Sequence, residues 1–127
     1  MTLSRRASRR TAFFLLYQWD VTGQPLASLY EGEVDDFALE TAEAVGGRVE
    51  ELDARITAAA EGWTADRLGA VERNILRVAT YELEEGEVPL EVVIDEAVTL
   101  AKRYASDEAG RLVNGILGGF ARGTEVA

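Results

Sequence analysis

The chain has 127 residues, 47% of them hydrophobic, and this length and composition fit one globular domain spanning residues 1–127. It contains no cysteine and no histidine, and its formal net charge is −10. The lack of cysteine excludes disulfides and thiolate chemistry. The lack of histidine removes the usual general base near neutral pH and the commonest metal ligand. We therefore expect a non-enzyme with no catalytic residue, no bound metal and no cofactor.

The longest early apolar run, at residues 12–17, is much shorter than the roughly 20 residues that a membrane-spanning helix needs. Four arginines precede this run, as they would in a secretory signal. The run is nevertheless shorter than the apolar part of such a signal, and no small-residue cleavage site follows it. We expect a cytoplasmic protein with no membrane partner.

The charge is distributed unevenly along the chain. Residues 1–19 contain four arginines and no acidic residue, whereas residues 20–127 contain the other nine basic residues and all 23 acidic ones, a net charge of −14. A cationic end on an acidic body can bind phosphate locally while the rest repels it. Such a protein should select its ligand by position and shape, and should bind it tightly only with a partner.

The first predicted helix begins after Ser4, a plausible N-cap, and ends near Asp20. Its apolar stripe has the i, i+3, i+4, i+7 spacing of one helix face and consists of Ala12, Leu15, Leu16 and Trp19. Arginines four residues apart project from neighbouring faces of its first two turns, and they are Arg5, Arg6, Arg9 and Arg10.

Apolar residues at helical spacing predict further helices at about residues 26–45, 48–61, 64–68, 70–85, 90–104 and 107–122. The main part of the second is expected to start at Asp35 and Asp36, which can cap a helix. Glycine or proline separates most of these segments. No segment alternates with a period of two, so we predict an all-α fold of six or seven helices.

Two interpretations of the four arginines are open. Cations at a helix N-terminus oppose the helix macrodipole, so they favour a nearby anion, and phosphate is one candidate. The other interpretation is a solvated helix start. Tyr17 could stack on nucleic-acid bases or belong to the core, and Trp19, on the apolar stripe, is assigned to the core.

Four blocks of the chain resemble the signature of the NusB family of transcription antitermination factors, in order and at compatible spacings. The first is Arg5-Arg6-x-x-Arg9-x-x-Ala12 followed by Leu16-Tyr17-Gln18-Trp19, and the second runs from Trp63 through Val71-Glu72-Arg73 to Tyr81-Glu82-Leu83. The third consists of Pro89 and the stretch from Val93 to Tyr104, and the fourth is Leu112-Val113-Asn114-Gly115-Ile116-Leu117.

The resemblance implies a compact fold in which the helices form two small packed bundles. It also implies a role in the complex that keeps bacterial RNA polymerase elongating through ribosomal RNA operons. Members of the family bind the boxA segment of the RNA together with NusE, a ribosomal protein, and join the polymerase through other Nus factors. They catalyse no reaction.

The resemblance also assigns residues to two surfaces. The expected RNA-binding residues are Arg5, Arg6, Arg9, Tyr17, Arg111 and Leu112, with Arg10 as an additional cation. The expected NusE-facing residues lie on the central helix and are Glu72, Arg73 and Glu82, with Glu72 the first choice. The chain departs from the family at Leu112, where the family usually has an aromatic residue, and at Ala109-Gly110, which replace polar residues.

Two alternatives remain open. A similar helical module precedes the catalytic domain of ribosomal RNA cytosine methyltransferases, but 127 residues leave no room for a cofactor-binding domain. The other alternative is a non-catalytic interaction scaffold, or a homodimer that covers the arginines.

Overall fold

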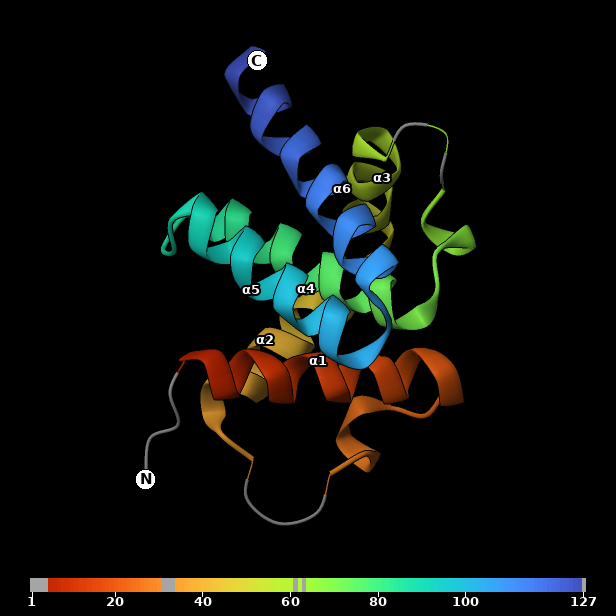
Figure 1. The fold of residues 1–127 in the computed structure, drawn as a ribbon. Coiled ribbons are helices and arrows are strands. Elements are labelled where there is room, and N and C mark those ends of the chain that lie inside the picture. Colours follow the sequence, from red (N-terminus) through yellow and green to blue (C-terminus); the bar gives the residue numbers. More distant parts are fainter. Residues whose placement is uncertain (1–4, 31–33, 61, 63, 127) are drawn as a thin grey trace.

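The structure is a computed structural model that describes residues 5–30, 34–60, 62 and 64–126, with side chains up to Phe120. It has six α-helices and two single 3₁₀ turns, with no strand in these residues (Figure 1). In chain order the elements are α1 (Arg5–Thr22), η1 (Leu26–Ser28), α2 (Asp36–Gly46), α3 (Val49–Ala59), η2 (Ala65–Arg67), α4 (Ala70–Glu85), α5 (Leu90–Tyr104) and α6 (Asp107–Val126). The all-α prediction is confirmed.

Helix α4 is the centre of the fold, because it contacts each of the other five helices (Figure 1). Its apolar stripe, which includes Ile75, Val78 and Ala79, is buried as the sequence predicts. Polar and charged residues of the same helix are buried as well, and they include Asn74, Arg77 and Thr80. The sequence pattern shows one apolar stripe and cannot reveal that other helices cover the polar face as well.

The buried residues form two clusters. The larger joins α4, α5 and α6 with Phe13 of α1 and Ile56 of α3. The smaller joins α1, α2 and α4 with Leu52 at the start of α3. Helix α1 therefore contributes to both clusters, and the arrangement confirms the two packed bundles.

Most helix boundaries agree with the prediction, and the main exception is the second segment. Residues 26–45 were expected to be a helical region with its main part starting at Asp35 and Asp36. The start of α2 at Asp36 agrees with that main part, but Leu26–Ser28 form only a single 3₁₀ turn. The cap is Asp35, whose carboxylate accepts a hydrogen bond from the Ala38 backbone N–H at 3.0 Å. Ser4 and Glu61, expected at two helix ends, lie outside the described residues.

Glycine and proline set the boundary between α4 and α5. Gly86 ends α4 in the left-handed conformation, with a φ of 71° that suits glycine. Pro89 precedes α5, which spans the predicted residues, whereas α6 continues to Val126 instead of ending at residue 122. None of the described helices is both long and apolar enough to cross a membrane.

Candidate nucleic-acid interface

The four arginines of α1 have different surroundings, and Arg9 is buried. Only 6% of Arg9 is exposed, and its Nη2 donates to Glu82 Oε2 at 2.8 Å while its Nε donates to the other oxygen of the same carboxylate. Burial opposes the charged form, but the hydrogen bond and the charge of Glu82 raise the pKa of Arg9 above its ordinary value. This two-point pair joins α1 to α4 inside the protein.

This pair involves two residues that the sequence analysis placed on different ligand surfaces. Arg9 was expected to face RNA, and Glu82 was expected to face a protein partner. The structure instead places both side chains at 7–8% exposure and in contact with each other. The i, i+4 spacing of the arginines gives no information on this, because it does not show which helix covers which turn of α1.

Arg5 and Arg6 are exposed but have acidic neighbours. Arg6 Nε donates to Glu96 Oε1 on α5 at 2.9 Å, and 77% of the Arg6 side chain remains exposed. The Arg5 guanidinium lies 4.2 Å from the centre of the Phe37 ring, and its Nη2 is 3.6 Å from Glu87 Oε2. The pair with Glu87 is a surface pair, which contributes little and exchanges readily for other anions. Glu96 is more enclosed, with 12% of its side chain exposed, and it also lies 3.5 Å from Arg9 Nη1.

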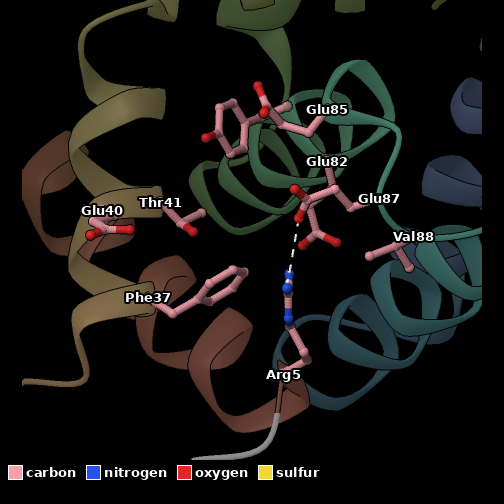
Figure 2. A pocket seen from close by; sticks show the side chains of 9 residues that line it. Arg5, Phe37, Glu40, Thr41, Glu82, Glu85, Glu87 and Val88 are labelled. Atoms are coloured by element: carbon pink, nitrogen blue, oxygen red, sulfur yellow. Dashed lines mark ion pairs between the residues drawn. The ribbon is translucent and has the colours of Figure 1, made fainter.

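Arg5 reaches into an acidic hollow between α1, α2 and the end of α4 (Figure 2). The hollow has a volume of about 190 Å³, and its lining includes Glu40, Glu85 and Glu87. Burial raises the pKa of the nearby Tyr81 phenol, and the charge of Glu85 raises it further. An RNA phosphate must compete with this negative environment to bind Arg5.

Arg10 is the cation of the cluster with the fewest competitors. It is half-buried, and its side chain makes no ion pair or hydrogen bond with another residue of the described part of the chain. It lies one helical turn before Phe14, so the two side chains share one face of α1. This face is distinct from the stripe of Ala12, Leu15 and Leu16 that enters the smaller core.

An aromatic hollow of about 420 Å³ follows Arg10 along α1. Its walls are Phe13, Phe14, Tyr17 and Gln18 of α1, Val71 of α4 and Tyr104 of α5. Tyr17 is half-buried, with its ring 6.4 Å from that of Phe13, so it both packs on the larger core and lines the hollow. Trp19 packs against the smaller core, as predicted.

Phe14 and Tyr104 line the hollow, although neither was predicted as a site residue. One signal was available, because Phe14 follows Arg10 by four residues and lies off the apolar stripe of α1. An aromatic residue outside the buried stripe is a candidate for ligand contact. No such signal exists for Tyr104, because only the fold brings the end of α5 against the middle of α1 (Figure 1).

The second half of the predicted RNA site lies at the start of α6. Arg111 is exposed, and Leu112 is half-buried against the larger core. The chain reaches them from Tyr104 by a short turn, and Tyr104 contacts Phe13 with ring centres 5.9 Å apart. Tyr104 therefore joins α1 to the end of α5, from which the chain turns into α6.

The remaining predicted partner residues lie at the start of α4. The Glu72 carboxylate covers Gly69, where a side chain would overlap it, and this places negative charge at the N-terminus of the helix. Arg73 Nη2 is 2.7 Å from Asp20 Oδ2, and its Nη1 donates to the Leu68 carbonyl at 2.8 Å. Arg73 thus connects the end of α1 to the loop before α4, while Glu72 stays partly exposed.

Asp20 is the shared acceptor at this junction. Its Oδ2 accepts hydrogen bonds from Arg73 and from Asn74 at 2.9 Å, and Arg77 approaches the same oxygen at 3.3 Å. Burial acts to raise the pKa of Asp20, but the hydrogen bonds from Arg73 and Asn74 outweigh it and the pKa is lowered. The charged form of Asp20 therefore stabilises the fold.

Five helices packed around the central helix α4, with cations and aromatic rings along one exposed face of α1, define a small all-helical macromolecule-binding protein. Residues 6–122 match the NusB family, and the chain belongs to that family. Transcription antitermination protein NusB of Rubrobacter xylanophilus is 45% identical over 124 residues, which cover 92% of this chain and 89% of that protein.

Solved structures share the fold. T. maritima NusB matches with a TM-score of 0.83 at 35% identity, covering 96% of this chain and 93% of that one. A chain from the crystal structure of the antitermination factors NusB and NusE in complex with dsRNA matches with a TM-score of 0.82 at 32% identity. That match covers 94% of this chain and 96% of the other.

Proposed function

We propose that this protein is a transcription antitermination factor that binds boxA-type RNA of ribosomal RNA operons together with NusE. It acts by binding alone, as one domain over residues 1–127, and works in the cytoplasm as part of the RNA polymerase elongation complex. Family membership supports this proposal, as does the likeness to a structure that contains NusB, NusE and RNA.

One observation carries the proposal furthest. On a chain with a net charge of −10, the exposed face of α1 presents the cations Arg6 and Arg10 and then the aromatic side chains of Phe14 and Tyr17. Phosphate contacts by arginine position RNA, and aromatic rings and polar side chains bind its splayed bases. This order of side chains suits a single strand lying along α1.

The RNA site in this proposal consists of Arg5, Arg6, Arg10, Tyr17, Arg111 and Leu112. Arg9 has a positioning role, because its pair with Glu82 holds the first turns of α1 on α4 and so positions the other arginines. RNA must displace Glu87 from Arg5 and Glu96 from Arg6. These exchanges lower the net gain from each cation and favour cooperation with a partner.

Glu72 is the proposed NusE contact, because it is a partly exposed carboxylate on a protein whose acidic body attracts a basic partner. A basic partner neutralises part of the acidic body and thereby raises RNA affinity, and the coupling between RNA and partner is reciprocal. Glu72→Arg should leave RNA affinity unchanged when RNA is added alone and should remove the gain that NusE gives. Undiminished NusE binding in calorimetry would contradict this assignment.

The test of the function as a whole is a titration with boxA-type RNA and a scrambled RNA of the same length, each with and without NusE. We expect the protein to prefer the boxA-type RNA and to bind it about tenfold or more tightly with NusE present. Equal affinity for both RNAs under both conditions would overturn the proposed function.

A further inference from the structure

Phe14 is the exposed aromatic side chain of the hollow on α1, and the core does not account for it. It is 40% exposed, whereas its neighbours Phe13 and Leu15 are buried. Its ring is part of a wider aromatic surface that lines the hollow, and a contiguous exposed apolar surface is a candidate contact site. The surroundings of Phe14 indicate which kind of ligand would contact the ring.

The rings around Phe14 pack against it and form a preformed aromatic surface, called the base platform below. Tyr104 meets Phe14 edge to face, with ring centres 5.1 Å apart and an interplanar angle of 80°. The ring centres of Phe13 and Phe14 are 5.4 Å apart, and Phe13 also lines the hollow. Because these rings come from α1 and α5, the platform exists only in the folded protein. Its volume of about 420 Å³ is in the range of small-molecule sites and leaves room for one planar group.

The charge beside the platform favours an anionic ligand. Arg10 stands one turn before Phe14 on the same face of α1, and its side chain has no acidic partner in the described part of the chain. The Arg103 guanidinium lies 5.5 Å from the centre of the Tyr104 ring, and the Arg103 side chain is exposed. Two cations therefore lie near the rings, one from α1 and one from α5, on a protein with a net charge of −10.

Gln18 adds a polar group to the apolar lining. It is exposed, it lines the hollow, and its side-chain amide can both donate and accept a hydrogen bond. An amide next to stacked rings can read the edge of a nucleic-acid base. A purely apolar partner surface would have no use for this amide or for the two arginines.

We propose that this hollow holds one unstacked base of a single-stranded RNA, stacked on Phe14 and bordered by Tyr104. Gln18 reads the edge of the base, and Arg10 and Arg103 bind the phosphates on either side. This inference rests on the proposed function, because it adds a base-binding subsite to the same RNA surface. It also gives the chain an aromatic contact in place of the one that Leu112 does not supply at the start of α6.

The test uses three variants of the full chain. Phe14→Ala removes the ring, Phe14→Tyr keeps an aromatic ring, and Val21→Ala removes another exposed apolar side chain of α1 that lies outside the hollow. We expect Phe14→Ala to bind boxA-type RNA about tenfold more weakly, since one base–aromatic stack is lost. Phe14→Tyr and Val21→Ala should bind as the unchanged protein does.

Two further readouts separate stacking from other roles. The salt dependence of RNA affinity should be the same for Phe14→Ala and the unchanged protein, because stacking releases no counterions. With 2-aminopurine placed at successive positions of the RNA, one position should show fluorescence quenched by the unchanged protein and not by Phe14→Ala. An abasic nucleotide at that position should weaken binding of the unchanged protein and leave Phe14→Ala unaffected.

The outcomes distinguish this inference from the proposed function. If the unchanged protein shows no preference for the boxA-type RNA, the proposed function fails. If that preference holds and folded Phe14→Ala binds RNA equally well, the base platform is wrong. If Phe14→Ala loses only the gain from NusE, the hollow is a protein contact and the base platform is wrong as well.

Discussion

The inner and outer faces of α1 carry the same residue types in opposite roles. On the inner face, Arg9 is enclosed with Glu82, and Asp20 at the other end of the helix is held by Arg73 and Asn74. On the outer face, Arg10 has no acidic partner in the described residues, and Phe14 is exposed. Residues 9 and 10 are adjacent in sequence, yet one belongs to the fold and the other to the ligand surface.

The comparison shows that an arginine cluster in a sequence is not one functional unit. A helix turns 100° per residue, so consecutive arginines point to different neighbours. Substitutions on the inner face should change stability and leave the RNA affinity of the folded protein intact. Substitutions on the outer face should weaken RNA binding and leave the stability of the protein unchanged.

The largest effect is expected for Glu82→Ala on the inner face. It removes the two-point partner of the buried Arg9 guanidinium and leaves only Glu96 Oε2, 3.5 Å from Arg9 Nη1. The free energy of unfolding should therefore fall by about 3 kcal/mol, measured by urea denaturation. The matched control is the double variant Arg9→Leu/Glu82→Leu, which removes both charges and should recover most of this loss. A loss well under 1 kcal/mol for Glu82→Ala would show that the pair does not hold α1 on α4.

On the outer face, Arg10→Glu should weaken binding of boxA-type RNA by more than tenfold and leave the unfolding curve in place. The reason is that one phosphate contact is replaced by a repulsion. Arg48→Glu, at the start of α3, makes the same change in net charge far along the chain and should weaken binding by about twofold at most. Similar losses for the two variants would mean that only total charge matters.

Asp20→Asn tests the inner face through pH. Because the folded pKa of Asp20 is lowered, its charged form contributes stability above the ordinary aspartate value, and this contribution is lost as pH falls through the folded pKa. The variant should be less stable by about 1 kcal/mol at pH 7, and the difference should shrink below about pH 4. Thermal unfolding between pH 3 and pH 7 measures this, and a constant difference would contradict it.

The smallest effect is expected for Glu87→Gln, which should release Arg5 to bind phosphate and tighten RNA binding by about twofold. Glu91→Gln removes the same charge from an exposed site on α5 and serves as the control. If both variants gain equally, the pair between Arg5 and Glu87 does not restrain RNA binding.

Most of the fold could be predicted from the sequence because helix periodicity and breakers are local signals. Helices α4 and α5 have the predicted bounds, with Gly86 and Pro89 between them. The helical prediction for residues 26–30 was wrong because apolar residues there continue a helical pattern, whereas the predicted start at Asp35 and Asp36 agrees with α2. Local apolar spacing overestimated the helical region, whereas the capping residues gave the correct start of the helix.

The candidate site could be predicted only in part, because its geometry depends on contacts between distant segments. The sequence indicates that Arg5 and Arg9 are four residues apart, but not that Glu82 is 73 residues away from Arg9 in sequence and adjacent in space. Tyr104 is likewise brought to Phe14 by packing of α5 on the larger core. The assignments of Arg111, Leu112 and Glu72 to ligand surfaces stay predictions.

The most direct test of the two-face account is the salt dependence of RNA binding by the unchanged protein and by Arg6→Gln/Arg10→Gln. The account predicts that the slope of log affinity against log salt becomes shallower by about 1.4, since two phosphate contacts each contribute about 0.7 for a single strand. The unfolding free energy should stay the same. An unchanged slope in the folded double variant would contradict the claim that the outer face of α1 binds the RNA backbone.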